Sequence, residues 1–237
     1  MPLPKIVTPT YTLVIPSSGK KITYRPFLVK EEKVLVMAME SDNMDQVGRA
    51  IKDVLSACIN TRGVRVEKLS TFDIEYLFLH IRGKSVGETI EVMATCPDDG
   101  ETKVPMTIAI DDIEVQQDPK HNKDIKLDDN LTLRMRYPSL TEFVDQNFGE
   151  GNKVTQSFDV ISSCIDMVFS EEETWDAKDH SKKEWNSFVE TLPSQAFKKI
   201  ETFFDTMPKL THSVTVKNPN TGIESQVVLE GLASFFT

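Results

Sequence analysis

The chain has 237 residues, of which 39% are hydrophobic and 27% are charged, a composition typical of a globular protein with a sizeable core. Its 37 acidic residues outnumber its 27 basic ones, which gives a formal net charge of -10. This charge argues against duplex nucleic acid and against an anionic membrane surface as the main partner, because phosphate binding requires a basic face.

No apolar run approaches the roughly 18 to 20 residues that span a bilayer. The first ten residues lack the apolar segment of a signal peptide. The three cysteines, Cys58, Cys96 and Cys164, are scattered rather than clustered. This usage is typical of a reducing compartment, so we expect a cytoplasmic setting.

Residues 11–112 are predicted to form a first α+β repeat. The three prolines of residues 1–10 predict an extended N-terminal arm ahead of it. The repeat is expected to open with a β-hairpin over 11–24, because alternating strands flank a Pro-Ser-Ser-Gly turn at 16–19. Residues 113–124 are polar and acidic and predict a surface linker.

Helical spacing begins at Val29 and predicts a helix that buries Val29, Val34, Met37 and Ala38. The charged residues 30–33 are expected on its opposite face.

A second helix is predicted from Met44 to Cys58 by apolar residues at the same spacing. A third is expected to begin at the capping pattern of Ser70 and Asp73 and to end at Gly83. The further expected elements are strands over 89–94 and 103–110, a hairpin over 125–135, helices over 181–192 and 194–207, and strands over 212–217 and 225–230.

Residues 125–237 repeat this order of elements. The sequence DVLSAC at 53–58 is echoed by DVISSC at 159–164, and an acidic insertion at 170–180 has no counterpart in the first half. We therefore predict an α+β fold of two related halves, each a β-hairpin plus helices plus a second strand–turn–strand. Chance similarity between two α+β segments is the alternative.

The turns 96–100 (CPDDG) and 218–222 (NPNTG) share the outline of a zinc knuckle, C-P-x-C-G. A structural zinc requires four ligands from two such knuckles, and here only the thiol of Cys96 is left. We expect plain β-turns without metal or cofactor, with a zinc-stabilised adaptor as the alternative.

No residue pattern indicates catalysis. The four histidines, His80, His121, His180 and His212, are far apart in the sequence, and no paired-histidine or cysteine–histidine spacing is present. The acidic pairs in the turns fit solvated loops better than a calcium site.

The candidate partner-contact residues lie at two places. Methionine and aromatic side chains are adaptable contact residues at interfaces, and the chain ends on Phe235 and Phe236, for which core packing and partner contact are both open. The charged run Lys30, Glu31 and Lys33 is a candidate docking surface, with an ordinary solvated helix face as the alternative.

Residues 15–41, IPSSGKKITYRPFLVKEEKVLVMAMES, closely resemble the T-even-type bacteriophage baseplate hub proteins, which are also described as hub assembly factors. Further matching stretches are DIEYLF at 73–78, RGKSVG at 82–87, and LEGL at 229–232 with the two terminal phenylalanines. The resemblance covers nearly the whole chain. Members of that family often carry cysteines in both turns, and this chain departs from that pattern at Asp99, Asn218 and Thr221.

The resemblance implies a phage tail baseplate hub protein, either a structural subunit or an assembly chaperone that acts by protein–protein contacts. The implied partners are other baseplate hub, tail tube or wedge proteins, with a second copy as a further candidate, and no nucleic acid or membrane. The implied location is the virion tail, and the host cytoplasm during assembly. No catalysis is implied. A cell-envelope-degrading hydrolase of the tail hub is the enzymatic alternative.

Overall fold

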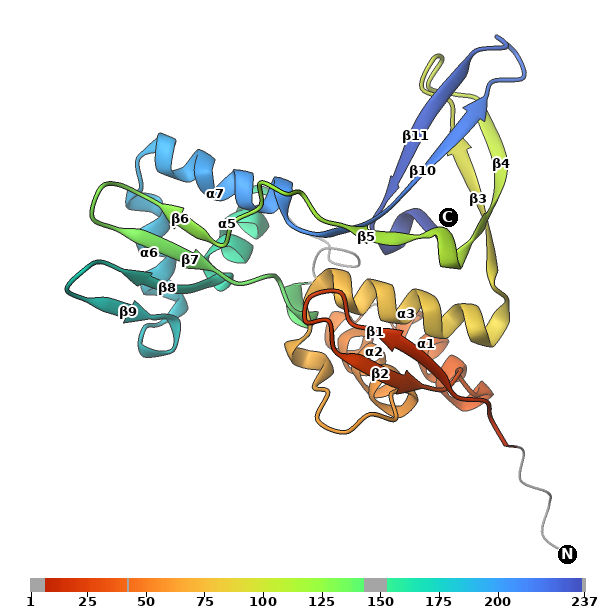
Figure 1. The fold of residues 1–237 in the computed structure, drawn as a ribbon, viewed down its shortest axis with the longest axis horizontal. Coiled ribbons are helices and arrows are strands. Elements are labelled where there is room, and N and C mark those ends of the chain that lie inside the picture. The colour runs from red at the N-terminus through yellow and green to blue at the C-terminus, as the bar shows by residue number, and fades with distance from the viewer. Residues whose placement is uncertain (1–6, 42, 143–152, 236–237) are drawn as a thin grey trace, which may run out of the picture. The chain divides into compact units, whose positions relative to one another are not determined.

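A computed structural model of the chain describes residues 7–41, 43–142 and 153–235. The chain forms two compact units, unit 1 from residues 1–116 and 209–237, and unit 2 from residues 117–208. Both units combine helices with small antiparallel sheets, which confirms the predicted α+β class (Figure 1). In the described ranges, no helix is both long enough and apolar enough to cross a bilayer.

Unit 1 begins with a β-hairpin that is followed by helices. In chain order the elements are β1 (Tyr11–Val14), β2 (Lys21–Tyr24), α1 (Val29–Met39), α2 (Met44–Cys58), the 3-10 helix η1 (Val66–Lys68) and α3 (Thr71–Val86). The strands pair antiparallel, with Leu13 opposite Ile22. Helix α2 begins at Met44 as predicted, and Asn43 caps it, because the side chain of Asn43 accepts the backbone N–H of Gln46 at 3.2 Å.

Helix α3 supplies much of the core of unit 1. It begins where predicted, because Asp73 accepts hydrogen bonds from the backbone N–H and the hydroxyl of Ser70. The predicted end at Gly83 is wrong, since the helix continues to Val86. Gly83 lies inside the helix at a close approach: a Cβ atom there would lie 2.7 Å from Cδ1 of Ile110. The glycine is therefore a packing residue rather than a cap.

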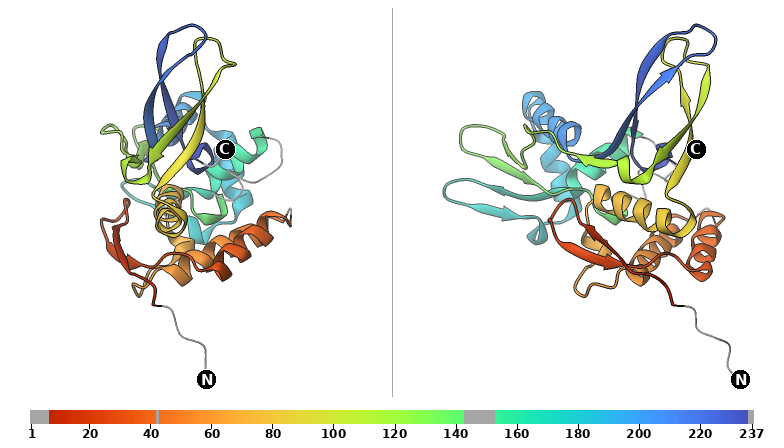
Figure 2. Two further views of the ribbon diagram at one scale, coloured as in Figure 1. Left: turned by 90° about the vertical axis from the view of Figure 1, so that its right-hand side faces the viewer. Right: turned by 45° about the vertical axis from the view of Figure 1, so that its right-hand side comes forward.

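Two further hairpins complete unit 1. The elements are β3 (Thr89–Thr95), β4 (Lys103–Ala109), η2 (Ile110–Asp112), β5 (Glu114–Gln116), β10 (Lys209–Lys217), β11 (Glu224–Glu230) and η4 (Leu232–Phe235). β3 pairs with β4, while β10 pairs with both β11 and β5. The predicted linker 113–124 thus contains β5 and the first residue of β6 (Asp124–Lys126). Figure 2 shows the β3–β4 and β10–β11 hairpins side by side along their length.

Unit 2 packs helices against one antiparallel sheet. Its elements are β6 (Asp124–Lys126), β7 (Thr132–Met135), α5 (Lys153–Ser163), β8 (Ile165–Phe169), β9 (Thr174–Asp176), η3 (Ala177–Asp179), α6 (Lys182–Thr191) and α7 (Ser194–Thr206). The strand order is β6-β7-β8-β9. Leu133, Cys164 and Ile200 are among the fully buried residues of its core. The predicted acidic insertion 170–180 covers the β8–β9 turn, β9 and η3.

Candidate functional site

Two similar turns lie at the ends of the hairpins of unit 1. They comprise residues 96–102 and 218–223, and we call them together the turn pair. In each turn a glycine, Gly100 or Gly222, donates its backbone N–H to the carbonyl of the turn's first residue, at 2.9 and 2.8 Å. Both glycines have positive φ angles, 70° and 75°, which other residues rarely adopt. The two related sequences thus fold into related turns.

The side chain of Asn218 joins the two turns. It is fully buried, and its Nδ2 lies 2.8 Å from Asp99 Oδ2 and 3.1 and 3.0 Å from the two carboxylate oxygens of Asp98. Its Oδ1 accepts the backbone N–H of Asn220 at 2.8 Å. The hydroxyl of Thr221 donates to Asp98 Oδ2 at 2.5 Å. The bonds to Asp98 and Asp99 connect segments that are about 120 residues apart in the sequence.

The charges of the turn pair fit this hydrogen bonding. The side chain and backbone of Thr102, and then Asn218, donate to Asp99 and lower the pKa of that carboxyl. The pKa of Asp98 is lowered by the bonds from Thr221 and Asn218. Burial, and then the two carboxylates, raise the pKa of the thiol of Cys96. The site therefore holds ionised acceptors against neutral donors, beside a protonated thiol.

The four knuckle positions of the turn pair are occupied by Cys96, Asp99, Asn218 and Thr221. Zinc binds thiolates rather than thiols, and the raised pKa of Cys96 disfavours the thiolate. Across the described part of the chain, no three His, Cys, Asp or Glu residues are grouped so that they could hold a metal ion. The likeness to a zinc knuckle stays a sequence prediction. The geometry supports a hydrogen-bonded tie between two hairpins.

A second notable surface is the outer side of α1. Val29, Val36 and Met37 are 82%, 50% and 59% exposed, and Val34 is exposed as well. Val29, Val36 and Met37 lie seven and eight residues apart, so they share one side of the helix. We call these three residues the α1 face. The prediction that Val29, Val34 and Met37 point into the core is wrong, although Ala38 is buried as expected.

Helix α1 is rotated about its axis relative to the predicted orientation, because the side chain of Glu31 points inward. Glu31 is only 5% exposed; its Oε1 lies 2.9 Å from Arg25 Nη2 and its Oε2 accepts the backbone N–H of Leu28 at 2.7 Å. Burial raises the pKa of Glu31, but the bonds from Arg25 and Leu28 outweigh it and leave the pKa below its ordinary value. A buried carboxylate requires such partners, so the ion pair fixes the helix orientation.

The predicted contact residues are placed differently from one another. Lys30 and Lys33 are exposed on α1, and Lys30 Nζ lies 3.3 Å from Glu31 Oε1. The carboxylate of Glu31 is buried and forms an ion pair with Arg25. Phe235 is 1% exposed and lies in η4, which packs on β3 and β11. Phe236 lies outside the described residues.

Sequence reasoning found the turns but missed how they meet. The shared Pro and Gly positions were the available signal, because they place Asp99 and Thr221 at corresponding points. The Arg25–Glu31 pair also had a signal, an arginine before a proline with a glutamate at the third position of the following helix.

A family model described as "T4 bacteriophage base plate protein" matches residues 8–237, which is nearly the whole chain. No match was found among the curated proteins or among the solved structures.

Proposed function

Because the chain belongs to the family described as T4 bacteriophage base plate protein, we propose that it serves in the baseplate hub of a contractile phage tail. It acts there through protein–protein contacts, as a structural subunit or as an assembly chaperone. Its partners are other proteins of the hub, the tail tube or the wedges.

The α1 face is the observation that carries this proposal. Large apolar side chains that lie together on one exposed helix side are typical of interaction sites. Lys30 and Lys33 lie on the same helix and are exposed beside them. Such a surface fits a partner with an apolar patch bordered by carboxylates, and burial of Val29, Val36 and Met37 at the contact would supply the affinity.

The test of the α1 face is the triple variant Val29→Ser, Val36→Ser, Met37→Ser. These side chains point away from the core, so the variant keeps its circular dichroism spectrum and melting temperature. We expect it to fail in restoring progeny to a phage that lacks the wild-type chain. The matched control is Met93→Ser, Val228→Ser, Ile223→Ser, which changes three exposed apolar residues of β3, β11 and the second turn. Equal progeny from the triple variant and the wild type would refute the proposal.

Mass spectrometry separates the two forms of the proposed role. A structural subunit is present in purified virions at a fixed ratio to other tail proteins. An assembly chaperone is present in baseplate intermediates and absent from virions. We propose that the chain has no catalytic role, and its membership of a family of baseplate proteins supports this. Clearing of a peptidoglycan gel by the purified chain would overturn that part.

We further propose that the halves 11–112 and 125–237 derive from one duplicated unit. Matching contacts in the two units support this. Arg25 donates from Nη1 to the carbonyl of the next residue, from Nη2 to Glu31, and from its backbone N–H to the carbonyl of Cys58. Arg136 makes the same three kinds of contact with the next carbonyl, with Glu142 and with Cys164.

The proposed halves do not coincide with the compact units. β10 and β11 come from the second half, yet they belong to unit 1. In a duplicated chain they correspond to β3 and β4, so the turn pair brings equivalent turns of both halves together. Each half would then complete a structure that the other half begins.

A further inference from the structure

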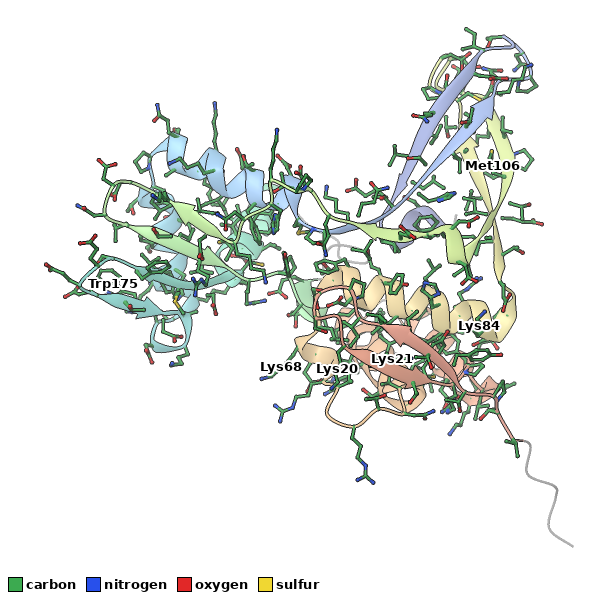
Figure 3. All side chains as sticks on the ribbon, viewed as in Figure 1. Lys20, Lys21, Lys68, Lys84, Met106 and Trp175 are labelled. Atoms are coloured by element: carbon green, nitrogen blue, oxygen red, sulfur yellow. The ribbon has the colours of Figure 1, made fainter. Side chains whose placement is uncertain are left out.

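A cluster of basic side chains lies on one part of unit 1. It consists of Lys20, Lys21, Arg62, Arg65 and Lys68, which we call the basic patch, and all five are exposed. Figure 3 labels Lys20 and Lys21 at the β1–β2 hairpin and Lys68 in η1. A basic cluster of this size is unexpected on a chain whose formal net charge is -10.

Hydrogen bonds hold the two segments of the basic patch together. The backbone N–H of Asn60 donates to Thr23 O at 2.8 Å, and the backbone N–H of Thr23 donates to Thr61 Oγ1 at 2.8 Å. Tyr24 pairs antiparallel with Ile59. The chain after Ile59 therefore starts back along β2 toward Lys21, and Arg62 follows Thr61 directly.

The other end of the loop is held as well. The backbone N–H of Ser17, in the hairpin turn, donates to Asp73 Oδ1 at 2.9 Å. Asp73 also accepts from Ser70, two residues beyond Lys68. The hairpin turn is thus fixed beside the end of the loop. The carboxylate of Asp73 is fully buried and already accepts these bonds, so it is not available to the patch.

The charges of the basic patch are uncompensated. Within residues 7–41, 43–142 and 153–235, none of its five side chains takes part in an ion pair. Glu67 is the only acidic residue in the segments 15–24 and 59–69. Like charges held close together repel one another, so the patch gains from an acidic partner.

Unit 2 presents a surface of complementary charge. The β8–β9 turn carries Glu171, Glu172 and Glu173 in succession, all exposed, and we call these three residues the acidic turn. Its backbone is fixed by Ser170, whose Oγ accepts the N–H of Glu172 at 3.2 Å and of Glu173 at 3.0 Å. In the described ranges these carboxylates form no ion pair either.

We infer that the basic patch of one copy of the chain binds the acidic turn of a second copy. Each surface is ordered by its own hydrogen bonds and carries at least three unpaired charges, so little ordering is required on contact. Two chains of net charge -10 repel each other overall, and a local contact of opposite charges offsets that repulsion. The contact joins different surfaces of the two copies, so it can extend to rings or filaments.

A protein partner fits the basic patch better than nucleic acid does. The two segments of the patch contain no aromatic residue apart from Tyr24, which is buried, whereas single-strand binding relies on exposed aromatic side chains. The remaining surface is predominantly acidic and repels a long polyanion.

The experiment uses two charge-reversal variants of the full chain. The patch variant is Lys20→Glu, Lys21→Glu, Arg65→Glu, and the turn variant is Glu171→Lys, Glu172→Lys, Glu173→Lys. Sedimentation velocity is recorded over a range of concentrations at ionic strengths of about 0.01 M and about 1 M, where the screening lengths are about 30 Å and about 3 Å. The control variant is Lys103→Glu, Lys120→Glu, Lys183→Glu. It alters the net charge by the same amount and in the same direction as the patch variant, but at exposed lysines outside the basic patch.

The inference predicts that the wild type and the control associate at low salt in a concentration-dependent way and dissociate at high salt. Each reversal variant alone is monomeric. An equimolar mixture of the two reversal variants associates again, because each then offers the charge that the other lacks. A wild type that is monomeric at low salt, a mixture that stays monomeric, or binding of a DNA duplex through the patch would each overturn it. These outcomes do not depend on the α1 face, so they are separable from the proposed hub function.

Discussion

The substitution Gly83→Ala tests how closely η2 packs on α3. The added Cβ atom would lie 2.7 Å from Ile110 Cδ1 and 3.5 Å from its Cγ2. Real carbon–carbon contacts are about 3.5 to 4.0 Å, so Ile110 has to move. Its side chain is 2% exposed, which leaves little room for another rotamer. Ile110 follows β4 directly, and so this contact helps to position the β3–β4 hairpin on the helix.

Opposing terms set the size of the effect. Alanine is favoured over glycine inside a helix by about 1 kcal/mol, whereas overpacking a core costs about 1 to 3 kcal/mol. We expect Gly83→Ala to lower the free energy of unfolding by about 1 kcal/mol. Ile110→Val removes Cδ1 and alone costs about 1 kcal/mol. In the double variant the new methyl group occupies the space of the lost one, so its stability returns to within about 0.5 kcal/mol of wild type.

Urea unfolding followed by circular dichroism measures all four proteins of this cycle. The combination of Gly83→Ala with Ile51→Val, a buried isoleucine of α2, is the control and should be additive. If Gly83→Ala stabilises the protein, or if its cost adds to that of Ile110→Val without rescue, the close approach in the structure is refuted.

Three further predictions concern buried polar groups. The folded-state pKa of Glu31 is lowered from its ordinary value of 4.5. The stability that the ionised side chain contributes is therefore present above that pH and is lost as the pH falls through the lowered pKa. The difference in unfolding free energy between wild type and Glu31→Gln, about 2 kcal/mol at neutral pH, should shrink in urea titrations at acidic pH. Burial raises the pKa of Cys58 to about 11 and that of Cys164 to about 12, so a thiol reagent at mildly alkaline pH should label both slowly in the native protein and rapidly in urea. Asn218→Ala should free the two hairpin ends from each other and speed amide hydrogen exchange in the turn pair while the rest of unit 1 stays protected.

Each of these predictions has a contrary outcome. A stability difference at Glu31 that is independent of pH would show that its charge does not stabilise the fold. Rapid labelling of Cys58 or Cys164 in the native protein would contradict their burial. Unchanged exchange in Asn218→Ala would mean that the two turns stay together without the hydrogen bonds of this side chain. The variant Asn60→Ala is the control, since it shows the background effect of removing a side-chain amide.

Local sequence signals correctly predicted those elements whose beginning and end are set by residues close by in the sequence. The hairpin around the turn 16–19 and the start of α3 at Ser70 and Asp73 followed from turn and capping chemistry. The helices expected at 181–192 and 194–207 agree with α6 and α7 to within a residue or two at each end. Such signals act over a few residues, and at these positions long-range packing does not override them, whereas at Gly83 it does.

The features that sequence reasoning missed depend on distant partners. The inward turn of Glu31 requires Arg25, which apolar periodicity does not register. β5 becomes a strand because β10, about 95 residues later, pairs with it. The outline of the turns was visible, but their contact through Asn218 joins segments of opposite halves of the chain. The strand β8 (Ile165–Phe169) was not anticipated, because it begins only two residues after the end of a helical segment, α5.

Lysine cross-linking can show whether α1 contacts another baseplate protein. Baseplate intermediates are isolated from phage-infected cells, treated with a lysine-reactive cross-linker and analysed by mass spectrometry. We expect cross-links from Lys30 or Lys33 to a second baseplate protein, and slower modification of these lysines in the intermediates than in the free chain. If both lysines are modified equally fast in the two samples and form no cross-link to another protein, α1 is not a contact surface in the baseplate.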